Sequence, residues 1–256
     1  MTTMHPLKVA DIRRESADTV SIAFEVPAHL ASTYRFQQGQ YLQLEAQLQG
    51  EAVRRSYSIF SAPTDGELRV AIKHVPQGRF SSYANTQLAV GDALLVMPPA
   101  GSSYRPEPQA QVHHCLGMAS GSGITALLPI IKTTLENDER SRFTLVYGSR
   151  DRASMLFGER LEALKGVYAE RLQLILLFSR EANNNGLPSG RLDIATCDCL
   201  FREWVDVSLL DAAFICGPQA MVETVGGALK DYGLAAERLH FERFAEPQPL
   251  REALPS

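Results

Sequence analysis

The segment Arg55-Ser56-Tyr57-Ser58 combines side chains that suit a bound nucleotide with a planar ring system. Alternation along a strand places Arg55 and Tyr57 on one face. An arginine makes forked contacts with a phosphate, an aromatic ring offers a stacking surface, and the Ser58 hydroxyl can donate to a ring nitrogen. The alternative interpretation is a strand with solvated arginines and a tyrosine that belongs to the core. We expect one part of a flavin site here.

A second segment, Gly78-Arg79-Phe80-Ser81-Ser82, opens the one helix expected in this half of the chain. Its glycine and hydroxyls lie at a helix N-terminus, where free N–H groups and the helix dipole attract an anion. The alternative is an ordinary serine cap, with the helix opening over residues 81–85. We expect this segment to hold a phosphate.

A third segment, Gly121-Ser122-Gly123-Ile124-Thr125, lies between an expected strand, 112–119, and an expected helix, 124–135. Glycines let the backbone approach a diphosphate closely, and the helix start supplies N–H donors. The string is shorter than the usual dinucleotide fingerprint, so a tight strand-to-helix turn is the alternative.

Ser149 and Arg150 follow the next expected strand, 143–147. In parallel nucleotide-binding sheets this position meets the adenosine ribose. A hydroxyl and an arginine favour a 2′-phosphate, and therefore NADPH, whereas the neighbouring Asp151 weakens that preference. A solvated turn is the alternative interpretation.

Cys216-Gly217-Pro218 ends a later buried strand, 212–216. Ligands of open α/β sheets bind at this carboxyl edge, and Gly217 leaves room for a flat ring. The alternative is that Cys216 is merely a small buried hydrophobic residue.

The chain has two halves of different texture. Residues 7–100 alternate apolar and polar residues in short runs, which predicts a small antiparallel β-barrel. From residue 110, apolar strands alternate with helices, which predicts a parallel sheet covered on both faces. We expect domains at 1–104 and 110–244, joined by a linker rich in Gly, Ser and Pro, and a tail at 245–256. Further elements expected in the second half are a helix at 154–164, a strand at 172–178 and a helix at 219–232.

Composition excludes several classes of protein. The formal net charge of −4 argues against nucleic acid as the main partner. No apolar run approaches the roughly 20 residues that span a bilayer, and we detect no signal peptide, so we expect a cytoplasmic protein without a membrane partner. The four cysteines fit neither a disulfide framework nor a plant-type iron–sulfur spacing, and Cys197-Asp198-Cys199 has no second ligand pair, so we expect no metal site.

Taken in order, these strings resemble the ferredoxin–NADP⁺ reductase superfamily over nearly the whole chain, from Leu7 to Phe244. The resemblance implies a FAD-binding antiparallel barrel followed by an NAD(P)-binding α/β domain. The strings that carry it are Arg55-x-Tyr57-Ser58, Gly78-x-x-Ser81, Gly121 to Thr125, Tyr147-Gly148-Ser149-Arg150, Cys216-Gly217-Pro218 and Glu242-Arg243-Phe244.

The resemblance also implies which residues contact each cofactor. Ser58, near the reactive N5 edge of the flavin, and Cys216, against the nicotinamide ring, are the expected positioning groups for hydride transfer. The implied FAD residues are Arg55, Tyr57, Ser58, Gly78, Phe80, Ser81 and Ser82, and Phe244 is a further cofactor-binding residue. The implied NADPH residues are Gly121, Ser122, Gly123, Ile124, Thr125, Ser149, Arg150, Cys216, Gly217 and Pro218.

The function implied by the resemblance is a flavin-dependent reductase. It passes hydride from NADPH to FAD, then single electrons to an iron–sulfur protein or oxygenase component. Within the superfamily the chain resembles the reductase subunits of phenylacetyl-CoA epoxidases, which continue past the Glu-Arg-Phe string into a [2Fe–2S] domain. Either such a domain follows Ser256 or a separate carrier accepts the electrons. The alternatives are a stand-alone ferredoxin or flavodoxin reductase and a non-catalytic module that senses redox state. The superfamily usually has proline where this chain has Ala126, and we expect nucleotide binding to survive that change.

Overall fold

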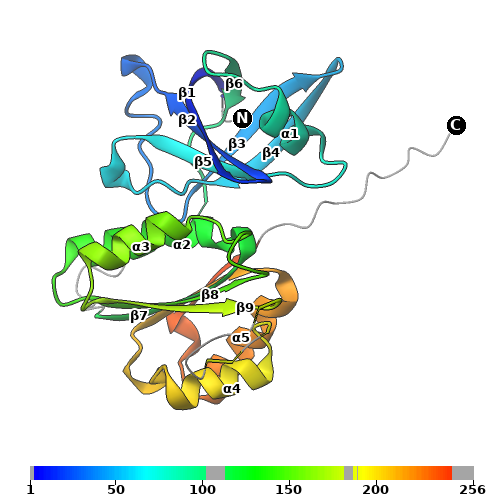
Figure 1. Ribbon diagram of the computed structural model, residues 1–256. Helices are drawn as coiled ribbons and strands as arrows, with labels where there is room; N and C mark the ends of the chain where they lie inside the picture. The colour runs from blue at the N-terminus through cyan, green and yellow to red at the C-terminus, as the bar shows by residue number, and fades with distance from the viewer. Residues whose placement is uncertain (1–2, 102–112, 182–186, 189, 244–256) are drawn as a thin grey trace, which may run out of the picture.

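Two sheets, one antiparallel and one parallel, make up the chain (Figure 1). The computed structural model describes residues 3–101, 113–181, 187–188 and 190–243. The N-terminal sheet has six strands, and the C-terminal sheet has five strands with helices on both faces. The predicted architecture, a barrel followed by an α/β unit, is confirmed.

The N-terminal sheet closes into a barrel. Its strands are neighbours in the order β4-β3-β6-β1-β2-β5, and a bridge between Ile59, just after β4, and Val70 in β5 joins the two ends. Alternation fills the interior: Leu42 and Leu44 on β3 are fully buried. The elements are β1 (His5–Ser16), β2 (Thr19–Glu25), η1 (Ala28–Leu30), β3 (Tyr41–Leu48), β4 (Glu51–Ser58), η2 (Pro63–Asp65), β5 (Leu68–Lys73) and β6 (Ala93–Val96).

Helix α1 (Arg79–Thr86) lies beside the barrel and begins two residues before the expected opening at Ser81. Its N-cap is Gly78, and no side chain makes a cap hydrogen bond there. The Ser81 hydroxyl is instead engaged by the preceding loop, since it accepts from the Val75 N–H at 3.1 Å. The alternative interpretation of this segment, an ordinary serine cap, is therefore wrong.

The C-terminal sheet has the strand order β11-β10-β7-β8-β9, and all neighbours are parallel. The chain runs outward from β7 to β9, then crosses to β10 and β11 on the other side of β7. The order thus reverses between β7 and β10, where ligands of open α/β sheets bind. The strands are β7 (His114–Ser120), β8 (Arg142–Ser149), β9 (Leu172–Phe178), β10 (Ala212–Gly217) and β11 (Leu239–Arg243).

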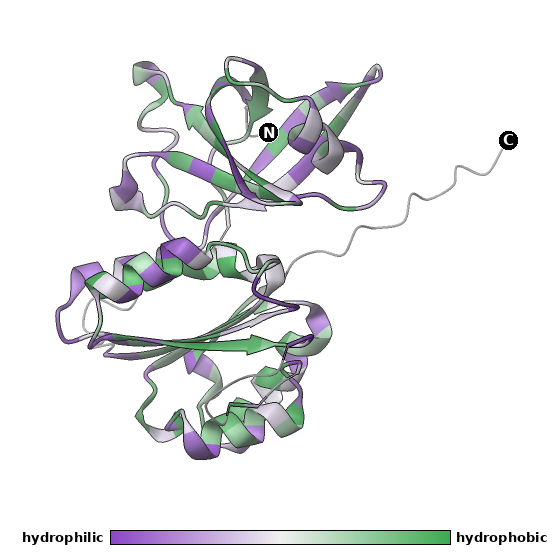
Figure 2. Cartoon of the chain, in the orientation of Figure 1, coloured by the Kyte–Doolittle hydropathy of each residue, from purple (hydrophilic) through white to green (hydrophobic). Residues whose placement is uncertain are grey.

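Helices cover both faces of this sheet. α2 (Ile124–Asn137) and α3 (Gly158–Val167) lie on the face toward the barrel, whereas α4 (Ile194–Glu203) and α5 (Gln219–Asp231) lie on the far face (Figure 1). Figure 2 shows β9 largely in the green of hydrophobic residues, as a strand buried between helix layers requires. Short 3₁₀ turns complete the unit: η3 (Gly121–Gly123), η4 (Val207–Leu209) and η5 (Ala236–Arg238).

Helix α3 begins four residues later than the helix expected at 154–164. The N-cap residue Phe157 has a positive φ of 59°, a conformation that a bulky side chain rarely adopts and that interrupts a helix. Its ring is 5% exposed and lies in the core, so packing rather than local preference holds this conformation.

Some expectations fall outside the described residues. These are most of the linker after Gly101, the tail and Phe244. Across the part of the chain that the structure describes, no helix is long and apolar enough to cross a bilayer.

Candidate functional site

The end of β4 carries the first predicted string. Arg55 is exposed, and its Nη1 donates to the Arg54 carbonyl at 2.7 Å. Tyr57 is half-buried, with its ring centroid 5.7 Å from that of Phe80. Burial raises the pKa of Tyr57 above its usual 10.0, so the phenol remains a proton donor at neutral pH. Ser58 is buried beside Tyr41 of β3. Arg55 and Tyr57 share a face, as expected, while Phe80 belongs to the barrel core.

The start of α1 holds the second string. Besides accepting from Val75, the Ser81 hydroxyl donates to the Gly78 carbonyl at 3.1 Å. Asn85 ties the helix to β5 by donating to the carbonyls of Ile72 and Ser81, at 3.1 and 2.9 Å. Ser81 therefore shapes the turn, which leaves the backbone N–H groups of the first helical turn as the better anion donors.

His74 is a residue that sequence reasoning missed. Its Nε2 lies 3.2 Å from the Ser82 hydroxyl, which places an imidazole at the same helix start. The signal available in the sequence was its place at the end of a strand, just before the glycine-led segment. Together Ser82 and His74 provide side-chain groups for an anion at α1.

The glycine turn after β7, residues 121–125, is stabilised by hydrogen bonds and by burial of one side chain. Gly121 has φ +55°, and its carbonyl accepts from the Tyr147 hydroxyl at 2.9 Å. The Thr125 hydroxyl donates to the Ser122 carbonyl at 2.9 Å, and Ile124 is fully buried in the core. The side chains of Ile124 and Thr125 thus hold the turn together, and contact with a diphosphate falls to the backbone N–H groups.

Cys216-Gly217-Pro218 lies directly beside this turn. Cys216 pairs with Ala119 across the β10–β7 ladder. A Cβ added to Gly123 would lie 2.1 Å from the Cys216 carbonyl oxygen, so only glycine permits this contact. The Cys216 side chain is fully buried, and the space next to Gly217 is occupied by the Met221 thioether. The expected contacts of Cys216 and Gly217 with a ring therefore stay predictions.

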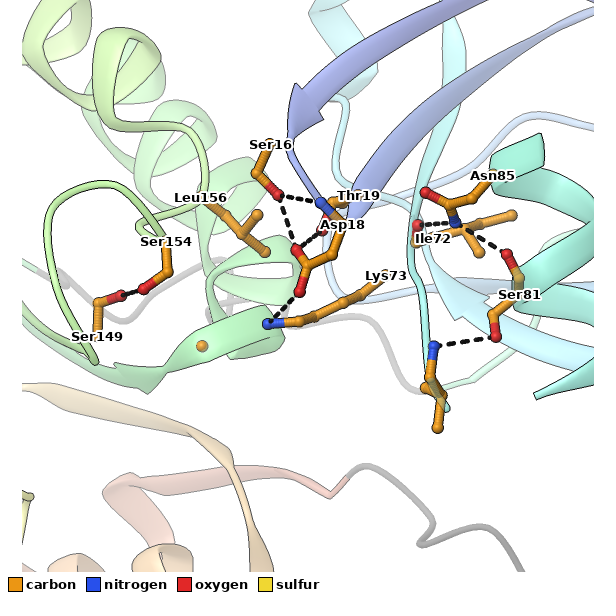
Figure 3. A network of polar contacts seen from close by, with 12 residues as sticks. Ser16, Asp18, Thr19, Ile72, Lys73, Ser81, Asn85, Ser149, Ser154 and Leu156 are labelled. Atoms are coloured by element: carbon orange, nitrogen blue, oxygen red, sulfur yellow. Dashed lines mark hydrogen bonds and ion pairs between the residues drawn. The ribbon is translucent and has the colours of Figure 1, made fainter. Parts of the chain in front are cut away.

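Ser149 and Arg150 lie at the carboxyl end of β8. The Ser149 hydroxyl is 3.4 Å from that of Ser154 (Figure 3), and Arg150 is exposed. The Asp151 carboxylate accepts from the Ser154 N–H at 2.8 Å. The hydrogen bonds from Ser154, with Arg150 nearby, hold the pKa of Asp151 below its usual range. Asp151 therefore acts as a turn-stabilising carboxylate.

Arg180, at the end of β9, is a second residue that sequence reasoning missed. Its N–H donates to the Arg150 carbonyl at 2.8 Å, and its side chain is exposed. Two arginines thus meet at neighbouring strand ends. Only the pairing of β8 with β9 reveals this, because the two residues are far apart in the sequence.

The donor set fits a dinucleotide on each half of the chain. Among the described residues no side chain caps α1 or α2, whose N-cap residues are the glycines Gly78 and Gly123. Helices α3 and α5 also lack a side-chain cap, but their N-cap residues are not glycine. Uncapped helix starts with glycine at the close approach are the features that a phosphate requires. No cluster of three or more metal-ligating side chains occurs in the described part of the chain, and burial raises the pKa of the Cys197 thiol to about 11.

Comparison with known proteins assigns both halves. Residues 6–104 match the family of the oxidoreductase FAD-binding domain, and residues 118–226 match that of the oxidoreductase NAD-binding domain. The chain is 44% identical over 248 residues to one component of the 1,2-phenylacetyl-CoA epoxidase of Escherichia coli K12, covering 96% of this chain and 69% of that protein. This chain belongs to the ferredoxin reductase family. As a member of that family it is an NAD(P)H-dependent flavin oxidoreductase that binds FAD and a nicotinamide nucleotide.

Other ferredoxin reductase family members extend the comparison. The ferredoxin reductase component of the 3-ketosteroid-9-alpha-monooxygenase of Rhodococcus rhodochrous is 33% identical over 240 residues, covering 93% of this chain and 64% of that protein. The chain thus spans about two thirds of the length of these two relatives. The solved ferredoxin NADP⁺ reductase of Neisseria gonorrhoeae, with bound FAD and NADP, shares the fold. Its TM-score is 0.78 at 21% identity, and the match covers 95% of this chain and 99% of that one.

Proposed function

We propose that the protein passes hydride from NADPH to FAD and then single electrons to an iron–sulfur carrier or oxygenase component. FAD, when bound, supplies the conversion of a two-electron donor into single electrons. A component of an epoxidase and the ferredoxin reductase component of a monooxygenase are relatives of this chain, which supports a partner of that class. The close approach of Gly123 to the Cys216 carbonyl carries the proposal, because it joins the glycine turn and the end of β10 into one continuous edge.

The proposed roles follow the two halves of the chain. Residues 1–104 form the FAD domain, residues 110–244 the NAD(P) domain, and residues 245–256 a tail or linker. Ser58 donates at the flavin edge, and Cys216 supports the nicotinamide from beneath the strand end. The proposed FAD residues are Arg55, Tyr57, Gly78, Phe80, Ser81 and Ser82, joined by His74, and Phe244 is a further proposed cofactor-binding residue. The proposed NADPH residues are Gly121 to Thr125, Ser149, Arg150, Gly217 and Pro218, joined by Arg180.

Anaerobic titration of the yellow, FAD-loaded protein with NADPH tests this function. We expect NADPH to bleach the flavin absorbance, and the reduced protein to reduce ferricyanide and an added ferredoxin. A yellow protein that NADPH does not bleach would be a nucleotide-binding module instead. A colourless protein that cannot be reconstituted with FAD would contradict the proposal altogether.

An Arg150→Ala change tests the preference for NADPH. Arg150 is exposed, its carbonyl accepts from the Arg180 N–H at 2.8 Å, and the turn already engages the Asp151 carboxylate. Loss of a charge-assisted contact to the 2′-phosphate is expected to raise the KM for NADPH about tenfold or more, and to leave that for NADH unchanged. Steady-state kinetics with both cofactors measure this.

Arg140→Ala is the matched control for this prediction. Arg140 is also an exposed arginine, but it pairs with Asp138 before the amino end of β8, at the opposite edge of the sheet. Arg140→Ala is expected to leave the KM values for NADPH and NADH unchanged. An equal rise in the KM values for NADPH and NADH in Arg150→Ala would show that Arg150 does not bind the 2′-phosphate.

We place the protein in the cytoplasm. NADPH is the proposed electron donor, and cytoplasmic enzymes have direct access to it. None of the four cysteines, all of which the structure describes, is in a disulfide, as is usual in a reducing compartment. Fractionation of the source cells, with the reductase activity followed in each fraction, tests this location.

A further inference from the structure

The barrel contacts the α/β unit through one buried carboxylate. Asp65, in the turn η2, has a side chain that is 10% exposed. One carboxylate oxygen bonds the Lys132 ammonium of α2, and the other lies 2.8 Å from an Arg160 guanidinium nitrogen of α3. The neighbouring Thr64 hydroxyl donates to Glu136 of α2 at 2.7 Å. A single turn of the barrel is thus fastened to two helices of the other half.

The electrostatics of this contact keep Asp65 charged. Burial alone would raise the pKa of its carboxyl. The Lys132 ammonium, the Ala62 N–H and the Arg160 guanidinium outweigh that effect and hold the pKa below its usual 3.8. Because the carboxylate has partners on both α2 and α3, movement of either helix against the barrel would separate a desolvated ion pair.

An aromatic contact runs beside the ion pairs. The rings of Phe60 and Phe157 lie 4.7 Å apart between centroids, and the two residues are 1% and 5% exposed. The Arg160 guanidinium lies 5.5 Å from the centre of the Phe60 ring, so it joins both contacts. We call Phe60, Asp65, Lys132, Phe157 and Arg160 the interdomain clamp.

On one side the clamp reaches the glycine turn. The N–H of Leu156, next to Phe157, donates to the Tyr147 hydroxyl at 3.2 Å, and that hydroxyl donates to the Gly121 carbonyl at 2.9 Å. Tyr147 is fully buried, so its ring has no freedom to move alone. The left-handed backbone of Phe157 is therefore held between the barrel and the glycine turn.

On the other side the clamp reaches the flavin strand. Phe60 follows Ser58 by two residues, and its N–H donates to the Arg69 carbonyl at 3.1 Å, in the bridge that closes the barrel. A displacement of Phe60 would therefore displace the end of β4. One path of packed and hydrogen-bonded groups thus joins Ser58 to Gly121.

We propose that the interdomain clamp sets the position of the nicotinamide edge against the flavin strand, so that Asp65 is a positioning residue for hydride transfer. The inference rests on the proposed function, because it takes Ser58 and the glycine turn as the two cofactor sites. A displacement of about 1 Å between reacting groups costs about 10²-fold in rate. A clamp that orients without touching either cofactor acts on the chemical step and leaves each binding step intact.

Asp65→Asn tests the clamp, because the amide keeps the shape and removes the charge. We expect full FAD content and a KM for NADPH within about twofold of wild type, but flavin reduction at saturating NADPH slowed about tenfold or more in stopped flow. Asp65→Glu is expected to recover most of the rate. Lys132→Met is expected to slow reduction similarly, and the double variant to be no slower than the worse single one, since both remove one contact.

Asp138→Asn is the matched control. It removes the same charge from an ion-paired aspartate outside the clamp, which lies in the α/β unit before the amino end of β8. It is expected to leave flavin reduction unchanged. Equal slowing in the control, or unchanged reduction in both Asp65→Asn and Lys132→Met, would overturn the proposal.

Amide hydrogen exchange gives a readout that needs no turnover. We expect exchange at Leu156 and Phe157 to be about tenfold faster in Asp65→Asn than in wild type, with or without FAD, and unchanged in Asp138→Asn. If NADPH fails to bleach the wild-type protein, the proposed function fails. Faster exchange would still establish the clamp as a structural coupling but not its role in hydride transfer. Unchanged exchange in Asp65→Asn would show that the interdomain clamp does not couple the barrel to residues 156–157.

Discussion

Gly123→Ala is expected to lower kcat/KM for NADPH by about 10²-fold while FAD binding is retained. An added Cβ would lie 2.1 Å from the oxygen and 2.7 Å from the carbon of the Cys216 carbonyl, and 3.3 Å from the Gly217 nitrogen. All three are backbone atoms of the strand end, so no flexible side chain can yield. The glycine turn must move away from β10, and the turn and strand end no longer form one edge for the dinucleotide. Stopped-flow reduction over a range of NADPH concentrations measures the loss.

Alanine substitutions at two other glycines serve as controls for this prediction. Gly121 has a left-handed φ but open space around a Cβ, so Gly121→Ala meets backbone strain of about 1–2 kcal/mol and no clash. Gly166, in α3, has neither, and Gly166→Ala is expected to leave kinetics unchanged and stability equal or slightly higher. The loss of kcat/KM for NADPH is therefore expected to be largest for Gly123→Ala, smaller for Gly121→Ala and absent for Gly166→Ala. A Gly123→Ala enzyme with the wild-type KM would show that the turn does not hold the nucleotide.

The sequence motifs of this enzyme could be recognised because each one consists of residues that are close together in the chain. A glycine turn between a buried strand and a helix, or an Arg-x-Tyr-Ser on a strand, is legible from neighbouring residues alone. The sheet order that places Gly123 against Cys216 follows from the general rule for switch points in parallel sheets. The two halves were recognisable for the same reason, since period-two alternation and alternating strands and helices are patterns within the chain.

The parts that sequence reasoning missed depend on contacts between distant segments. Arg180 meets Arg150 only through the β8–β9 pairing, and Asp65 finds Lys132 and Arg160 only when the barrel docks on α2 and α3. No local rule links these residues. The start of α3 was misplaced for a related reason, because the packing of Phe157 overrides the helical preference of the residues before it.

Arg69→Ala is expected to lower the free energy of unfolding by about 3–5 kcal/mol, a larger loss than that of a surface charge. The Arg69 side chain is 1% exposed within the barrel. It bonds the Asp11 carboxylate, lies 3.0 Å from Glu67 and donates to the Ser21 hydroxyl at 3.0 Å. Its removal leaves a cavity, and the Asp11 and Glu67 carboxylates keep only the exposed Arg13 as a shared cation. Urea unfolding followed by circular dichroism measures the change.

Arg54→Ala is the control, since Arg54 also pairs with a carboxylate, Glu45 at 2.7 Å, but its side chain is 49% exposed. Its loss is expected to cost at most about 1 kcal/mol. A similar small cost for Arg69→Ala would show that the barrel does not depend on its buried arginine.

The pH dependence separates lost pairing from lost packing at Arg69. The hydrogen bond from Arg69 is the main cause that holds the pKa of Asp11 below its usual 3.8. A carboxyl with a lowered folded-state pKa stabilises the fold above its unfolded pKa, and that contribution disappears as the pH falls through the folded-state value. The difference in stability between wild type and Arg69→Ala is therefore expected to be largest near neutral pH and to shrink below pH 3.8. The difference in free energy of unfolding that remains at acid pH measures packing, because a cavity does not titrate. A difference that stays constant with pH would mean that Arg69 stabilises the barrel through packing alone.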